Sequence, residues 1–466
     1  MSLPRQWPSG FLLLVVLATA CSGPAIEDVV TQFADGDYDE ALETLDDCRA
    51  DDPGNSQLYD LEEAMILLAA GDPDGCVQVL RSARDQLDSL AGDSLREQVN
   101  SLLLDDRQRD WEGSDYEHVL VRALLAVAEL MARGSGAGSD AEAYALQVLE
   151  RQQEIIRNYQ AEGETNPKAE YRLVAFGSYL RAVLNEEQPL NRDVARRSFR
   201  KALELKPGLG PAMEGLERTT TGRHSRKGHG VVHVFAMLGR GPRRVEREEV
   251  ASTSAINLAK LLWAAIRGNA ALPEVRAVPI PGLDFLPGNP ASMLVEVDGR
   301  AEGSTRTVTD IEQVARTEFD VMQEQVVVRA ILRRALKVAV VEGSKEGIRN
   351  NVESVEGRFV AELGASIAGL IWTSTEGADL RCWRLLPATI QVCRVELPVG
   401  EHELVLRPRS ESGQLGAEQR IRVDVRDGRN TYVLAMTPTV DGGPTPLTSL
   451  APFPFPALET EQSSGG

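Results

Sequence analysis

Three alternating residues in the last quarter of the chain are the best candidates for a binding site. They are Asp379, Arg381 and Trp383. Alternate side chains of an extended segment point to one side, so an acid, a base and an indole would form a polar and aromatic patch there. The same residues would also suit packing, with an Asp379–Arg381 ion pair that fixes a loop and Trp383 as its anchor. The spacing leaves both interpretations open.

A second reactive position is Cys21, which ends an N-terminal leader. Arg5 supplies a positive charge, and the apolar run over 11–20 is ten residues long, whereas a transmembrane helix needs about 20. Small residues directly before the cysteine resemble the lipobox of bacterial lipoproteins, in which the thiol is acylated and the cysteine becomes the N-terminus. We therefore predict a signal peptide over 1–20 and a lipidated N-terminus over 21–24. Simple cleavage before Cys21, which would give a secreted or periplasmic soluble protein, is the alternative.

The residue after this cysteine bears on location. An aspartate there is the usual signal for retention in the inner membrane, and this chain has Ser22. The leader therefore favours an outer membrane lipoprotein that faces the periplasm. In that compartment the remaining cysteines could form the disulfides Cys48–Cys76 and Cys382–Cys393 or stay as buried thiols.

The sequence offers few residues for catalysis or metal binding. It contains no G-x-S-x-G, no H-E-x-x-H and no Cys–His arrangement. Of its five histidines, His224, His229 and His233 lie in or beside a basic, Gly-containing stretch over 217–230 that repels cations. We therefore expect a non-enzymatic protein with no metal and no cofactor. A compact pocket with two carboxylates, at least one with a raised pKa, would instead favour an envelope hydrolase.

Length and charge limit the possible classes. With 466 residues the chain is too long for one ordinary core, which predicts two domains. The net charge of −20 argues against nucleic acid, whose phosphates need a basic surface. It argues equally against electrostatic docking on anionic lipid, so membrane attachment would depend on a lipid at Cys21. The acidity itself is typical of a well-solvated surface.

The first half of the chain carries an internal repeat. GDYDEA at 36–41 places a glycine in the turn between two helices, followed by aromatic and small positions that pack. LLAAGDPDGC at 67–76 repeats the turn, and the two glycines, Gly36 and Gly71, are 35 residues apart. The tetratricopeptide repeat (TPR) has a period of about 34 residues and the same small and apolar positions. We predict a TPR-like α-solenoid of roughly eight helices over 25–215, whose concave groove would hold a peptide or a partner helix.

The second half changes pattern after a linker over 216–230. Helical periodicity predicts helices over 257–267 and 308–341, and β-branched runs between Gly, Pro and Asp turns predict strands. We therefore predict an α+β domain over 231–437 with a mostly antiparallel sheet. A Pro/Gly/Ser-rich tail over 438–466 is predicted to be disordered. The predicted strands are 231–235, 292–297, 367–373, 389–396, 402–407, 419–425 and 431–435.

Several segments share a family pattern. They are DYE at 115–117, GRGPRRVE at 239–246, VTDIEQVARTEF at 308–319 with RAILRRALK at 329–337, and ADLRCWRLLP at 378–387 with LPVG at 397–400. These segments are similar to an uncharacterised bacterial family of TPR-containing envelope lipoproteins, although Leu380 stands where the family's A-D-T-R-x-W usually has Thr. The resemblance implies a place in the cell envelope, often beside lipoproteins that activate penicillin-binding proteins. It implies no particular activity.

Together these expectations give a multidomain α + α/β chain, with an N-terminal TPR-like α-solenoid followed by an α+β domain. We expect a lipid-anchored, non-catalytic scaffold or assembly factor that binds envelope proteins in its TPR-like groove. It would attach to the membrane by its N-terminal lipid and would bind no nucleic acid. The alternative is a module that binds peptidoglycan, polysaccharide or secreted polypeptide through the α+β domain, and an envelope hydrolase is the least favoured.

Overall fold

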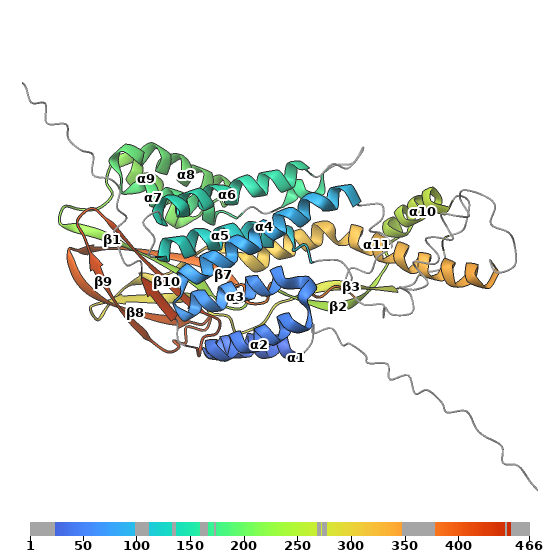
Figure 1. Cartoon of the computed structure of the whole chain (residues 1–466). Coiled ribbons are helices and arrows are strands. Elements are labelled where there is room, and N and C mark those ends of the chain that lie inside the picture. The colour runs from blue at the N-terminus through green and yellow to red at the C-terminus, as the bar shows by residue number, and fades with distance from the viewer. Residues whose placement is uncertain are drawn as a thin grey trace, which may run out of the picture.

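A computed structural model describes residues 24–97, 111–132, 137–158, 166–171, 174–267, 272, 277–346, 378–442 and 445–448. The predicted signal peptide, Cys21 and the strand predicted over 367–373 lie outside these residues. Figure 1 shows a layer of helices beside a group of strands that come mostly from the end of the chain. The protein is therefore α+β, as predicted from the sequence.

The first half of the described chain forms helices that pack in sequence order. Each contacts mainly the helix before it and the helix after it, as in an array of helical hairpins. Short 3-10 turns that start with proline lie between some of them, at η1 (Pro53–Asn55), η4 (Pro167–Glu170) and η5 (Pro189–Asn191). The helices are α1 (Pro24–Asp35), α2 (Tyr38–Asp51), α3 (Ser56–Ala70), α4 (Pro73–Glu97), α5 (Asp115–Met131), α6 (Ala137–Asn158), α7 (Phe176–Glu186), α8 (Arg192–Leu205) and α9 (Gly210–Thr221).

The predicted repeat turn has the same geometry in both copies. φ is 87° at Gly36 and 89° at Gly71, in the left-handed region that favours glycine. In both turns the amide after the glycine donates to the carbonyl five residues earlier. The small and apolar positions that were predicted to pack after the turns are buried, namely Ala41, Leu45, Cys48, Cys76, Leu80 and Ala83.

The described residues of the second half form three sheets. The five-stranded sheet has the order β11-β10-β1-β7-β6, the four-stranded sheet has the order β5-β4-β8-β9, and β2 and β3 form a separate hairpin. β1 and β10 are parallel and the other pairs are antiparallel, which confirms the prediction of a mostly antiparallel arrangement. The elements are β1 (His229–Leu238), β2 (Arg243–Val250), α10 (Thr253–Arg267), β3 (Ala277–Asp284), β4 (Ser292–Val297), β5 (Arg300–Ser304), β6 (Arg306–Asp310), α11 (Ile311–Glu346), β7 (Thr389–Pro398), β8 (Gly400–Arg409), β9 (Gln419–Val425), β10 (Asn430–Thr437) and β11 (Thr445–Thr448).

The five-stranded sheet is the middle of three layers. Alternate side chains of a strand point to opposite faces, so Val232 and Val234 of β1 pack with the four-stranded sheet while Phe235 packs with the helices. The core on the helix side is continuous from Val29 in α1 to Met436 in β10. The predicted domains over 25–215 and 231–437 are therefore not separated by their packing.

α5 lies at the centre of this packing. Every side chain from Tyr116 to Met131 is buried. α4 and α6 pack on it from the array, and β10 and α11 contact it from the second half of the chain. A helix covered on all sides is a core helix, so α5 joins the array to the sheet and to α11.

A smaller core lies at one end of the molecule. It joins α10, β3 and the middle of α11 through Trp263, Ile280 and Ile331. In Figure 1 this end extends to the right of the main body, next to the β2–β3 hairpin. It adds a lobe that the sequence did not predict.

Several predicted boundaries need correction. The linker over 216–230 is mostly structured, because α9 continues to Thr221 and β1 begins at His229. The tail over 438–466 contains β11, which pairs with β10. The helix predicted from residue 308 begins at Ile311, since the preceding residues form β6.

The cysteines of the described chain are buried. Cys76, Cys382 and Cys393 are thiols outside any disulfide, and Cys48 is fully buried in α2. Burial raises the pKa of Cys382 to about 12 and that of Cys393 to about 11, because it disfavours the thiolate. The sequence left open disulfides or buried thiols, and Cys76, Cys382 and Cys393 are buried thiols.

Candidate functional site

The segments that carry the family resemblance meet at the first turn of α5. Residues 115–117 open this helix, and one residue from each of three other segments binds there. Arg244 comes from 239–246, Glu318 from 308–319 and Trp383 from 378–387. We call residues 114–117 with the side chains of Arg244 and Glu318 and the backbone amide of Trp383 the α5 hub. It brings together residues from four of the segments that carry the family resemblance.

Glu318 of α11 occupies the position of an anion at the start of α5. Its Oε1 accepts from the amide of Asp115 at 2.9 Å, and its Oε2 accepts from the amide of Tyr116 at 2.8 Å. The first amides of a helix have no partner within the helix, and the helix dipole favours a negative group there. Glu117 accepts from the amide of Ser114 at 2.6 Å, as in a capping box. Docking of α11 therefore completes the hydrogen bonding of the α5 terminus.

Burial changes the acidity of Glu318. It raises the pKa of this carboxyl to about 8, and the negative charge of Asp115 adds to the shift. The two amides and the charge of Lys168 act in the opposite direction without cancelling it. The hub therefore holds a carboxyl group that keeps its proton to a higher pH than an exposed glutamate does.

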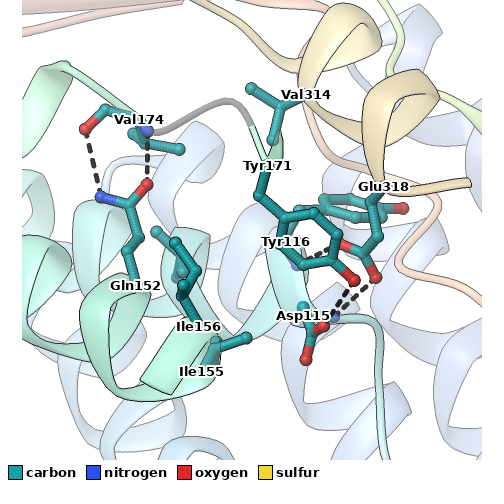
Figure 2. A pocket seen from close by; sticks show the side chains of 10 residues that line it. Asp115, Tyr116, Gln152, Ile155, Ile156, Tyr171, Val174, Val314 and Glu318 are labelled. Carbon is teal, nitrogen blue, oxygen red and sulfur yellow. Dashed lines mark hydrogen bonds between the residues drawn. The ribbon is translucent and has the colours of Figure 1, made fainter. Parts of the chain in front are cut away.

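Figure 2 shows a cavity between α5, α6, α11 and the segment around Tyr171. Its volume is about 20 Å³, which is room for one water molecule. Binding pockets for drug-sized ligands measure roughly 300–1,000 Å³, so a sugar or peptide substrate does not fit. The lining residues are Asp115, Tyr116, Val119, Gln152, Ile155, Ile156, Tyr171, Val174, Val314 and Glu318.

Both carboxylates of this cavity already have partners. Asp115 accepts from the ammonium of Lys168 at 2.6 Å and from the hydroxyl of Tyr171 at 2.9 Å. Both oxygens of Glu318 accept backbone amides. Two carboxylates and one raised pKa match the pattern that would favour a hydrolase. However, both oxygens of Glu318 and Oδ2 of Asp115 are engaged, and the cavity is too small for a substrate. The arrangement is that of a buried helix cap.

The predicted patch of Asp379, Arg381 and Trp383 does not lie on the surface. The guanidinium of Arg381 donates from Nε and Nη2 to both oxygens of Asp379, each at 2.9 Å. The indole of Trp383 has no exposed surface. Arg381 also donates to Asn55 at 2.6 Å, and its carbonyl accepts from the indole of Trp111 at 3.2 Å. The residues therefore follow the packing interpretation, in which the ion pair fixes a loop and Trp383 anchors it.

The loop that contains these residues is bound along the helical array. We call residues 378–388 the strap. Glu117 of α5 accepts from the amide of Trp383 at 2.7 Å, and Glu62 of α3 accepts from the amides of Arg384 and Leu385 at 2.6 and 2.9 Å. Glu27 of α1 accepts from the guanidinium of Arg384 at 2.6 Å. Three odd-numbered helices thus each supply one carboxylate to consecutive residues of the strap.

Sequence reasoning missed Glu62 and Arg244. Glu62 is fully buried, and burial raises its pKa to about 8 although it accepts two amides. A glutamate within the apolar run of α3 is the signal that could have marked it. Arg244 donates to the hydroxyl of Ser114 at 2.6 Å. Burial would lower the pKa of Arg244, but the nearby charges of Glu117 and Asp379 outweigh it and raise that pKa.

A second buried polar cluster joins the array to the sheet. The carboxylate of Glu186 at the end of α7 lies 3.1 Å from Arg218, 3.6 Å from His233 and 3.7 Å from Arg394. Burial would raise the pKa of Glu186, but these neighbours lower it to about 2. Burial lowers the pKa of His233 to about 4, so its ring is neutral at pH 7.

The same cluster changes the interpretation of the histidines. His224 is buried and bonds to Asn430 at 2.8 Å, so it belongs to the core, whereas the sequence had placed it in a linker. Across the described ranges, no three His, Cys, Asp or Glu side chains are grouped so that they could hold a metal ion.

The structure also bears on membrane attachment and kinship. No helix among the described residues has the length and apolar composition needed to cross a bilayer. Four of the segments that resemble the family of envelope lipoproteins meet at the α5 hub. Membership of the chain in that family stays a prediction. No protein-family model, no curated protein and no solved structure matches this chain.

Proposed function

We propose that this protein is a lipid-anchored, non-catalytic scaffold or assembly factor of the cell envelope, built on a TPR-like solenoid. Its helices stack in sequence order, and the turns at Gly36 and Gly71 share one geometry 35 residues apart, which is typical of such repeats. The proteins that it binds would be other envelope proteins, and nucleic acid is not among its partners.

The observation that carries this proposal is the way in which the array holds the strap. Glu117, Glu62 and Glu27 bind a loop of the chain by its amides and by one arginine. A helical array whose carboxylates accept backbone amides in this manner has chemistry that suits a bound peptide. Here that surface is occupied by the chain itself and by the five-stranded sheet. We therefore place the partner on a part of the array that the strap and the sheet leave exposed.

In-cell photocrosslinking tests the scaffold proposal. A photoreactive amino acid is placed at Gln78 on α4 or Arg197 on α8, both exposed, and at Arg422 on the four-stranded sheet. We expect discrete crosslinked envelope proteins from the two array positions and none from the buried control at Trp383. Products from Arg422 alone would contradict the proposal.

Membrane attachment would come from a lipid on Cys21. α1 begins at Pro24, three residues after this cysteine, so the lipid would hold the first hairpin close to the bilayer. We expect the chain to incorporate labelled fatty acid and to sediment with outer membranes, and Cys21→Ala to abolish both. A soluble chain without label would reject the anchor and leave simple cleavage as the alternative.

A second candidate function uses the outer face of the four-stranded sheet. That face is exposed and charged, with Arg420 bridging Glu403 and Glu418 at 2.8 Å each. It suits polar ligands such as peptidoglycan, polysaccharide or a secreted polypeptide. Binding of isolated cell wall should be measured with the whole mature chain, because the sheet layers share their core with the helices. Loss of cell-wall binding in Arg420→Ala, with the array crosslinks unchanged, would favour this candidate.

A further inference from the structure

β11 lies at the edge of the five-stranded sheet, between the sheet and the repeat turns. It pairs antiparallel with β10 over four residues, from Val433↔Thr448 to Met436↔Thr445. Because alternate side chains of a strand point to opposite faces, Thr445 and Leu447 share the side that faces the helices. The end of the described chain therefore meets its beginning.

Both copies of the repeat turn contact this strand. The hydroxyl of Tyr38, two residues after Gly36, lies 2.8 Å from the hydroxyl of Thr445. At the second turn, a Cβ built on Gly71 would lie 3.5 Å from a methyl of Leu447. The repeat turns and β10 thus form the walls of a slot, which we call the β11 slot, and Thr-x-Leu is the pattern that fills it.

The residues of β11 are less buried than those of β10, the strand with which it pairs. β11 has four residues, all of them only half-buried, and Pro446 has no amide to donate. In contrast, Val433, Leu434, Ala435 and Met436 of β10 are buried. A short edge strand of this kind opens at a much smaller free-energy cost than the whole protein. The slot can therefore become empty while the rest of the fold stays intact.

We propose that the β11 slot is a binding site for an extended segment of a partner protein, which adds to β10 as an antiparallel strand when β11 leaves. Strand addition supplies affinity through the backbone, and the walls select a hydroxyl residue and an aliphatic residue two positions apart. Exposed carboxylates flank the slot, so lysine or arginine beside the Thr-x-Leu pattern would strengthen binding. These carboxylates belong to Asp35, Asp37, Asp72 and Asp74.

This proposal deepens the scaffold function and rests on it, because it says where a partner binds once the face under the strap is excluded. It also explains why the two repeat turns are alike, since each supplies one wall contact to the same strand. The occupant seen in the structure defines the chemistry of the ligand that fits.

The test uses the full mature chain and a fluorescent peptide with the sequence of residues 442–450. Leu447→Asp in the chain places a charge against the Gly71 wall and should expel β11, so the peptide should bind this variant. The unaltered chain should bind it at least about tenfold more weakly, because its own strand competes at a high effective concentration. Leu447→Asp within the peptide should abolish binding. Failure of the peptide to bind a folded Leu447→Asp chain would overturn the proposal.

Two controls keep the test decisive. Tyr38→Phe in the Leu447→Asp chain removes one hydroxyl and should weaken the peptide several-fold. Two added lysines in the peptide should tighten binding in a salt-dependent manner, and an equal effect of two added glutamates would contradict the charge rule.

A disulfide lock covers the case in which Leu447→Asp does not fold. Ala435 and Pro446 face each other across the two strands, so Ala435→Cys with Pro446→Cys should close the slot when oxidised. In the chain that carries only these two cysteines, peptide binding should disappear on oxidation and return on reduction. Equal peptide binding by the oxidised and the reduced chain would show that the peptide binds outside the β11 slot. A dimer abolished by the lock would assign the slot to a second copy and overturn the assignment to a partner. Fatty-acid labelling and crosslinking from the array do not depend on peptide binding. Failure of the β11 slot proposal can therefore be told apart from failure of the scaffold proposal.

Discussion

At the scale of single residues, buried glutamates bind the chain together through backbone amides. Glu62, Glu117 and Glu318 together accept six amide hydrogen bonds from α5, its cap and the strap. Two of these carboxyls are buried deeply enough that their pKa rises to about 8. The stability of the protein should therefore depend on pH within the neutral range.

Linkage between proton binding and folding determines whether a rise in pH stabilises or destabilises the protein. Glu62 binds its proton more tightly in the folded chain, because burial raises its pKa from 4.5 to about 8. Its contribution to stability is complete below pH 4.5 and is lost as pH rises to about 8. Glu62→Gln cannot titrate, so we expect its urea midpoint to fall less than that of the unaltered chain between pH 5 and 9. Glu302→Gln, at an exposed glutamate, is the control, and parallel curves for all three proteins would contradict the prediction.

At the scale of elements, the repeat turns set where the helices of the array begin and end. Gly36 and Gly71 both have φ near the left-handed region, which costs a residue with a side chain about 1–2 kcal/mol. A Cβ at Gly36 meets nothing within 4 Å, and one at Gly71 makes only an ordinary contact with Leu447. The cost of a substitution should therefore come from the backbone at both sites.

We expect Gly36→Ala and Gly71→Ala each to lower the free energy of unfolding by about 1–2 kcal/mol, measured by urea titration. Gly54→Ala is the control, because Gly54 lies in the 3-10 turn η1 between two helices, with open space around it and without a left-handed φ. It should be neutral or slightly stabilising, since alanine restricts the unfolded chain. Equal losses at all three glycines would contradict the backbone explanation.

Some elements of the fold could be predicted from the sequence and others could not. β4 and β9 have the predicted bounds, because apolar residues alternate in them between clear turn signals. β2 was missed because its sequence, RRVEREEV, has too few apolar residues to alternate. The α5 hub could not be found at all, since it depends on contacts such as Glu117 with Trp383, 266 residues apart. Local patterns predict elements, whereas the partners of a buried charge depend on the assembled fold.

At the scale of the whole molecule, the helices and the sheets form one structural unit. Phe235, Tyr432 and Leu434 lie on the helix side of the five-stranded sheet and belong to the same core as α1 to α9. Without the array, this face of the sheet would be exposed to water. The two-domain expectation drawn from length alone does not hold for the packing.

We therefore expect a fragment of residues 231–437 not to fold alone. Its amide proton spectrum should be poorly dispersed and its thermal unfolding should lack a cooperative transition, whereas the mature chain should unfold in one step. Co-expression with residues 22–230 is the control, because it restores the missing face and should recover dispersed signals. A fragment that melts cooperatively by itself would reject the shared core.

The contact between Tyr38 and Thr445 has a consequence for the way the protein is made. These residues are 407 positions apart, so a ribosome that adds about 5–20 residues per second needs roughly 20–80 s to pass from one to the other. During that time the nascent hairpins have neither strap nor sheet to cover their apolar sides. Non-local closure of this kind is slow and exposes the incomplete chain to aggregation. We therefore expect the incomplete polypeptide to depend on shielding of these apolar sides until β11 has been synthesised.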